Sequence, residues 1–229
     1  ESGKAAFYEI TASNSYTNPI AEMSLGTDVT VTIEYYAKKD VAHIYFGDVC
    51  CAVTSITYST DSGKLEPASV TIKTDSAALG LTVDNVVMES YDKFYAHQVA
   101  NGQNPETNAN KITFESSTTG NLPQRFSTDL RTASAAIRIK EMMRGGKASK
   151  VMEFETSAGA NDKLYFLSQN DGTTGKKVTV FESSIAFDMN GGGATYELYL
   201  SNKDGRFSYL LILAHSGSPL SINDLTGNS

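Results

Sequence analysis

The stretch Val29-Thr-Val-Thr-Ile-Glu-Tyr35 decides the fold, because apolar and polar side chains alternate over its whole length. Successive side chains of an extended strand point to opposite faces, so Val29, Val31, Ile33 and Tyr35 would share one face. An apolar face of this kind is buried against a core, and the opposite face is polar. The stretch therefore predicts a β-strand with one buried face.

The same alternation recurs along the chain, with turn residues between the runs. Gly47-Asp48 and Asp61-Ser62-Gly63-Lys64 predict turns, as do Asn170-Asp171-Gly172 and Lys203-Asp204-Gly205, where glycine accepts a positive φ. Many short strands with almost no helix predict an all-β sandwich or barrel. The other runs predicted as strands are 7–10, 43–46, 49–58, 70–74, 81–88, 111–115, 135–142, 151–155, 163–167, 178–189, 196–200 and 207–214.

Two stretches differ from the simple pattern of short alternating strands. Residues 98–111 carry no periodic pattern and are predicted to be a linker. The segment from Ala133 to Arg144 is rich in residues that favour a helix, but its order Ala-Ala-Ile-Arg-Ile-Lys also alternates. Because its neighbours are predicted strands, we favour a strand, with a helix as the alternative.

Composition narrows the class of protein. The 229 residues suffice for one large sandwich or two small domains. A net charge of −7 argues against nucleic acid or anionic membrane as a partner, because phosphate needs a basic surface. No apolar run reaches the roughly 18 residues of a membrane span, so we expect no membrane insertion.

The character of the sequence points to an extracellular or cell-surface location. Ser, Thr, Gly and Asn are abundant, and the lack of any Asn-x-Ser/Thr acceptor fits a bacterial source. The sequence begins at Glu1, without an initiator Met or a signal peptide, so we expect a processed form or a piece of a longer protein.

The cysteines and histidines favour structural roles over metal or redox chemistry. Cys50 and Cys51 are adjacent, and a disulfide between neighbours requires a strained ring. We expect one thiol to face the core and the other outward, both free and packed as small hydrophobes, with a redox or switch role as the alternative. His43, His97 and His215 are too scattered for a zinc site, and we expect His43 to be a core or edge residue.

Two blocks of sequence carry a family resemblance. One contains Ile112-Thr-Phe-Glu-Ser-Ser-Thr-Thr-Gly-Asn-Leu-Pro123, followed by runs at 150–154, 180–188 and 196–200. The other contains Val31-Thr-Ile-Glu-Tyr-Tyr36, then 43–47, then Val83-Asp-Asn-Val86. The first block resembles the opening strands, and the second the closing half, of the LamG and concanavalin A-like family of bacterial surface proteins. The resemblance implies a jelly-roll β-sandwich of two antiparallel sheets.

The order of the two halves is reversed relative to that family. Residues 1–97 resemble its second half and residues 112–229 its first, with 98–111 between them. Strands need partners on both sides and a second sheet over their apolar face, so we expect neither half to stand alone. We favour one circularly permuted sandwich domain. The alternatives are one register of a tandem array or self-complementing polymer, in which 111–229 completes the next copy's 1–97, and two independent small sandwiches.

The sequence shows little that would support catalysis. Glu153 and Glu155 have the i, i+2 spacing of a glycosidase carboxylate pair. The family resemblance implies a tighter Glu-x-Asp-x-Glu cluster, which the chain lacks, and Phe154 would point inward and leave both glutamates on a solvated face. No Gly-x-Ser-x-Gly elbow or phosphate-binding glycine loop is present, and Gly191-Gly192-Gly193 predicts a hairpin tip. We therefore expect no enzyme activity.

Tyrosines and acidic residues supply the candidates for ligand binding. Sugars are held by aromatic platforms with a few polar groups, and tryptophan is absent, so we predict Tyr36, Tyr45 and Tyr199 as glycan-binding candidates. The family resemblance implies that Asp84 and Glu115 lie side by side and hold a structural calcium ion. Loop alternatives for calcium are Asn161-Asp162 and Asn170-Asp171.

These observations favour a noncatalytic, lectin-like or adhesive surface module that binds a glycan or another surface component. The main alternative is a structural repeat or filament unit whose partner is its own neighbour. A divergent polysaccharide hydrolase is the weaker alternative.

Overall fold

The computed structural model of the chain describes residues 4–9, 21–24, 26–55, 67–74, 80–92, 94–95, 111–123, 125–129, 136–144, 146–155, 163–167, 178–188, 195–201 and 208–216. Almost all of these residues are extended. The strands are β1 (Lys4–Glu9), β2 (Ala21–Ser24), β3 (Val29–Tyr36), β4 (Val41–Phe46), β5 (Val49–Ser55), β6 (Ser69–Thr74), β7 (Gly80–Ser90), β8 (Phe126–Asp129), β9 (Ala136–Arg144), β10 (Lys147–Glu155), β11 (Lys163–Leu167), β12 (Val178–Asp188), β13 (Thr195–Ser201) and β14 (Ser208–Ser216).

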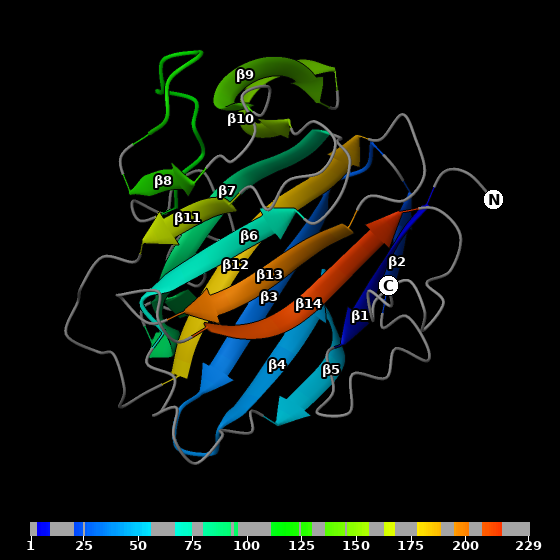
Figure 1. Cartoon of the computed structure of the whole chain (residues 1–229), viewed down its shortest axis with the longest axis vertical. Coiled ribbons are helices and arrows are strands. Elements are labelled where there is room, and N and C mark those ends of the chain that lie inside the picture. The colour runs from blue at the N-terminus through cyan, green and yellow to red at the C-terminus, as the bar shows by residue number, and fades with distance from the viewer. Residues whose placement is uncertain are drawn as a thin grey trace, which may run out of the picture.

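The strands form two antiparallel sheets that lie against each other, as Figure 1 shows. Sheet A has the order β2-β1-β14-β13-β6-β11-β8, and sheet B has the order β5-β4-β3-β12-β7-β10-β9. The prediction of an all-β protein with two antiparallel sheets is confirmed. Its finer assignment to the jelly-roll family stays a prediction.

Each sheet contains strands from both halves of the sequence, and in each sheet one strand lies between two strands of the other half. In sheet B, β12 lies between β3 and β7, and Phe181 is paired with Ile33 on one side and Met88 on the other. In sheet A, β6 lies between β13 and β11. Segments 1–97 and 111–229 therefore supply each other with strand partners.

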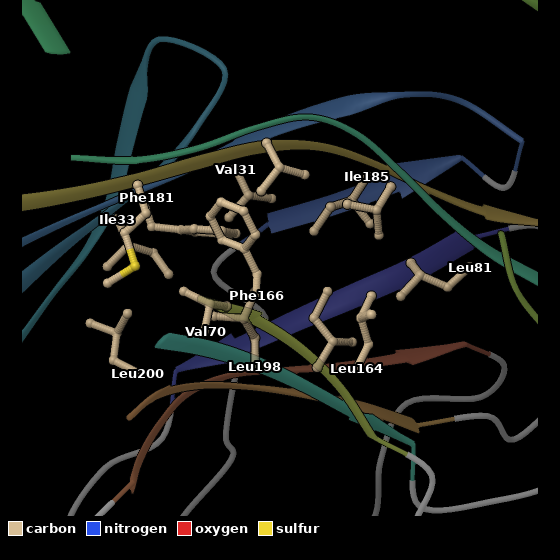
Figure 2. Close-up of a cluster of buried hydrophobic side chains, with 14 of the residues drawn as sticks. Val31, Ile33, Val70, Leu81, Leu164, Phe166, Phe181, Ile185, Leu198 and Leu200 are labelled. Carbon is tan, nitrogen blue, oxygen red and sulfur yellow. The ribbon is translucent and has the colours of Figure 1, made fainter. Parts of the chain in front are cut away.

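One hydrophobic core lies between the sheets (Figure 2). Val31, Ile33 and Phe181 from sheet B face Val70 and Phe166 from sheet A, and each is no more than 3% exposed. Burying side chains of this size stabilises the fold by about 1.5–3 kcal/mol each before conformational entropy is counted. The core contains residues of both segments, so it binds them together as well as joining the sheets.

The segment around residue 140 is a strand, and the helix alternative is wrong. Ile139 of β9 is fully buried, whereas Arg138 and Lys140 on either side reach the opposite face of sheet B. β9 pairs with β10 along its whole length, from Arg144 to Ala136, and this antiparallel ladder takes up backbone hydrogen-bonding groups of β9. The alternating pattern therefore outweighs the helical preference of the single residues.

The prediction of a strand at 111–115 is wrong. These residues form one isolated β-bridge and no strand. Ile112 pairs with Val86 through two 2.9 Å backbone hydrogen bonds, and the chain then turns, with Phe114 at a φ of 61°. A positive φ breaks the extended ladder. Lys111, placed at the end of the predicted linker, is ordered by an ion pair with Glu182. The rest of the linker, 98–110, lies outside the described residues.

The predicted turn at Gly47-Asp48 is confirmed. Gly47 has a φ of 60° and joins β4 to β5 in a two-residue hairpin, a conformation that glycine adopts without steric cost. The other predicted turns lie outside the described residues.

Candidate functional site

After β7 the chain folds back over the outer face of sheet B, the face away from the core. Tyr91, Asp92, Phe94 and Tyr95 have helical conformation. Phe94 is 2% exposed and packs in a small cluster with Val87 of β7 and Val180 of β12, with Tyr95 against it. This apolar contact fixes the turn over the sheet and brings its tyrosines to β3.

Three tyrosine hydroxyls converge on the Glu34 carboxylate. Tyr95 Oη donates to Oε1 at 2.5 Å, Tyr36 Oη to Oε2 at 2.7 Å, and Tyr45 Oη to Oε2 at 3.2 Å. Glu34 is only 3% exposed. The hydroxyls supply the donors that a buried carboxylate requires, and the carboxylate in turn fixes the three rings.

Further rings extend this group, which we call the tyrosine face: Glu34, Tyr36, His43, Tyr45, Tyr91 and Tyr95. The centroid of the His43 ring lies 4.6 Å from the ring centroid of Tyr36 and 6.5 Å from that of Tyr45. The ring centroids of Tyr91 and Tyr95 are 4.5 Å apart, and Tyr91 as a residue is 38% exposed. The tyrosine face thus presents aromatic surface to solvent above a fixed acid.

The three hydroxyls that donate to Glu34, those of Tyr36, Tyr45 and Tyr95, stay protonated over the physiological range. Burial raises the pKa of Tyr45 to about 12, and the neighbouring Glu34 charge adds to the rise. Burial first, and then the hydrogen bond to Glu34, also raise the pKa of Tyr36 and of Tyr95. These tyrosines therefore remain hydrogen-bond donors to Glu34 at any ordinary pH.

The predicted glycan residues do not lie together. Tyr36 and Tyr45 are neighbours on sheet B, whereas Tyr199 lies on β13 of sheet A, where Leu198 and Leu200 beside it face the core. Sequence reasoning missed Glu34, Tyr91 and Tyr95. The alternation of β3 could have placed Glu34 on the face of Tyr36, but nothing local shows that the turn folds back there.

His43 lies on the outer face of β4, which is an interior strand of sheet B. It is partly exposed between two tyrosines, so its prediction as a core or edge residue is wrong. The cysteines are free, as predicted, and Cys51 packs against the core. Cys50 is exposed, so it is not packed as a small hydrophobe. The side chains of His97 and His215 lie outside the described set.

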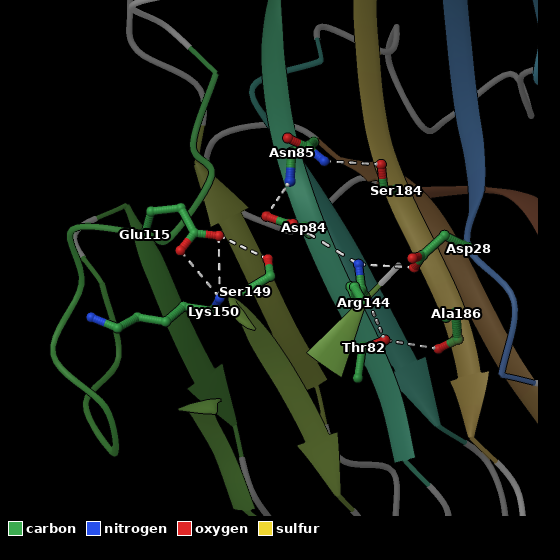
Figure 3. Close-up of polar contacts among 10 residues, drawn as sticks. All are labelled: Asp28, Thr82, Asp84, Asn85, Glu115, Arg144, Ser149, Lys150, Ser184 and Ala186. Atoms are coloured by element: carbon green, nitrogen blue, oxygen red, sulfur yellow. Dashed lines mark hydrogen bonds and ion pairs between the residues drawn. The ribbon is translucent and has the colours of Figure 1, made fainter. Parts of the chain in front are cut away.

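Asp84 and Glu115 lie in one corner of sheet B, shown in Figure 3. Asp84 Oδ1 accepts the Asn85 N–H at 2.7 Å, and Oδ2 is 3.9 Å from Arg144 Nη1, which lies 2.8 Å from Asp28. Glu115 Oε1 accepts Ser149 Oγ at 2.8 Å and the Lys150 N–H at 3.2 Å. Each acid thus has partners of its own.

The donors in this corner do not by themselves make a calcium shell. Calcium takes six to eight oxygens, and here a guanidinium faces one of two separately bonded carboxylates. Among the described residues no three His, Cys, Asp or Glu side chains are grouped to hold a metal ion. The loop alternatives lie outside that part of the chain. Calcium stays a prediction, which a thermal melt with added calcium and then with chelator decides.

Glu153 is neither solvated nor one of an exposed pair. Phe154 points into the core, as predicted. Glu153 reaches the other face but is only 7% exposed, and it forms ion pairs with Arg138 and Lys140. The prediction of a solvated Glu153 is therefore wrong, because β9 covers it with two cations. The side chain of Glu155 lies outside the described set.

Comparison with known proteins gives no assignment: no family model matches the chain, and no curated protein sequence matches it. Among the described residues, no helix has the length and apolarity needed to cross a membrane.

Proposed function

We propose that the chain is a noncatalytic, lectin-like surface module whose tyrosine face binds a saccharide. The observation that carries the proposal is the convergence of Tyr36, Tyr45 and Tyr95 on the buried Glu34 carboxylate beside the exposed Tyr91 ring. A preformed aromatic surface with a few fixed polar groups is the usual construction of a sugar site.

The chemistry of the tyrosine face suits sugar rings. An exposed ring such as that of Tyr91 offers apolar area to the C–H face of a pyranose. Each tyrosine oxygen that donates to Glu34 keeps lone pairs, so it can accept a hydrogen bond from a sugar hydroxyl. Because the rings are already held by Glu34, binding would cost little further ordering.

The family and the location remain part of the proposal. The two antiparallel sheets are compatible with a jelly roll of the concanavalin A-like class, and the sequence composition with an extracellular setting. The partner is then a glycan or another component of a surface.

Replacing Tyr91 with alanine tests the proposal without removing any donor to Glu34. A glycan array identifies the best saccharide, and calorimetric titration then compares wild type with the variant. We expect Tyr91→Ala to weaken binding about tenfold, because it removes an exposed aromatic platform. Tyr199→Ala, on the other sheet, is the matched control and should bind as the wild type does.

A glycan array on which the wild type binds nothing would refute the proposal. If wild type and Tyr91→Ala bind with equal affinity, or if only Tyr199→Ala weakens binding, the saccharide binds somewhere other than the tyrosine face.

Self-association is a second candidate, and the end strand of sheet B favours it. Among the described strands β5 is the last in the order of that sheet, and it carries no charge and exposes Val49 (64%) and Val53 (59%). Uncharged edge strands pair readily with further strands. If copies assemble through β5, the sedimentation coefficient rises with protein concentration, and Val53→Lys abolishes the rise. The saccharide proposal expects no such rise.

A further inference from the structure

Among the described residues Glu34 has no basic partner, whereas three other acids of the same sheet face have one: Asp84, Glu153 and Glu182. On that face Lys111 lies 2.7 Å from Glu182, Arg138 and Lys140 hold Glu153, and Arg144 faces Asp84. Glu34 is as deeply buried as any of these, at 3% exposed, yet its partners within the described residues are tyrosine hydroxyls.

Hydroxyls satisfy the hydrogen bonds of a carboxylate but leave its charge in place. The Glu34 carboxylate accepts from the hydroxyls of Tyr36, Tyr45 and Tyr95, and the faces of these rings carry negative potential of their own. Both features attract a cation approaching from solvent. Within the described part of the chain no cation balances the charge of Glu34, in contrast to the paired acids Asp84, Glu153 and Glu182.

We propose that the saccharide bound by the tyrosine face carries free amino groups, so that an ammonium group of an amino sugar balances the charge of Glu34. The inference rests on the proposed function and names its ligand class. An ammonium group has three N–H donors for tyrosine oxygens and a positive charge for the ring faces. N-acetylation of the same sugar removes the charge and keeps the ring available for stacking.

Two oligosaccharides that differ only in acetylation test the inference on the full chain. Binding of chitosan hexasaccharide and of chitin hexasaccharide is measured by calorimetry at mildly acidic pH, where the free amines are protonated. We expect about tenfold tighter binding of chitosan. The preference should fall as salt rises, because the Debye length shrinks from about 30 Å at 0.01 M to about 3 Å at 1 M.

Glu34→Gln should abolish the preference for chitosan over chitin, and a cooperative urea unfolding transition like that of the wild type shows that the variant is folded. Glu141→Gln, an exposed acid on β9 at the opposite end of the sheet, is the matched control and should keep the preference. If Glu34→Gln does not fold, the salt series on the wild type decides the question alone.

The remaining outcomes separate the two proposals. Equal binding of chitin and chitosan overturns the amino-sugar inference and leaves the saccharide site standing. No binding of either oligosaccharide, in a protein that binds another glycan at Tyr91, also overturns the inference. No binding of any glycan overturns both proposals. Hexalysine binding as tightly as chitosan would overturn the sugar class, since charge alone would then suffice.

Discussion

Replacing Phe181 with alanine is expected to lower the free energy of unfolding by about 3–5 kcal/mol. Phe181 is 2% exposed, lies on the interior strand β12, and belongs to the core cluster shared by the two sheets. Truncation removes apolar area from the contact between sequence-distant strands and leaves a cavity that a packed interior closes only in part. Urea titration would show a lower midpoint with an unchanged slope.

Met143→Ala is the control for Phe181→Ala, because Met143 lies in the same sheet but is 68% exposed. Its effect should stay within about 0.5 kcal/mol. Similar losses from the two variants would contradict a core that spans both sheets.

Replacing Asp84 with asparagine is expected to change how stability depends on pH. Burial raises the pKa of Asp84 from 3.8 to about 7, against the opposing effects of the Asn85 N–H and Arg144. A carboxyl with a raised pKa favours the folded state only while protonated. Its contribution is complete below about pH 4 and is lost as pH rises through about 7, a difference of about 4 kcal/mol.

Asp84→Asn should therefore unfold like the wild type at pH 4 and be more stable at pH 8, by up to about 4 kcal/mol. Urea titrations at a series of pH values measure this difference. Asp48→Asn, exposed in the β4–β5 turn, is the control and should keep the wild-type profile. If the unfolding free energies of Asp84→Asn and wild type differ by the same amount at pH 4 and at pH 8, ionisation of Asp84 does not change the stability of the fold in this range.

The strands were largely predictable because each long one alternates between a core and an outer face. β3 and β9 show this most clearly, since Ile33 and Ile139 are buried and Glu34 and Arg138 lie on the other face. The short strands β2 and β8 were missed, because four residues are too few to establish a period. The turn at Phe114 was missed because a phenylalanine rarely adopts a positive φ.

Sheet order and the site could not be predicted from local pattern. The placement of β12 between β3 and β7 depends on contacts between distant segments, and no local preference encodes it. Alternation could put Glu34 and Tyr36 on one face, but Tyr95 reaches Glu34 only because Phe94 anchors its turn on that sheet. Tyr199 was grouped with the other tyrosines because sequence does not reveal which sheet a strand joins.

The central claim, that the tyrosine face binds saccharide, is tested most directly by NMR titration of the full chain with the saccharide that binds most tightly on the glycan array. The account predicts that the amide shifts that move belong to residues around Glu34, His43 and Tyr91. Shifts centred on Tyr199 of sheet A, or no shifts at all, would contradict it.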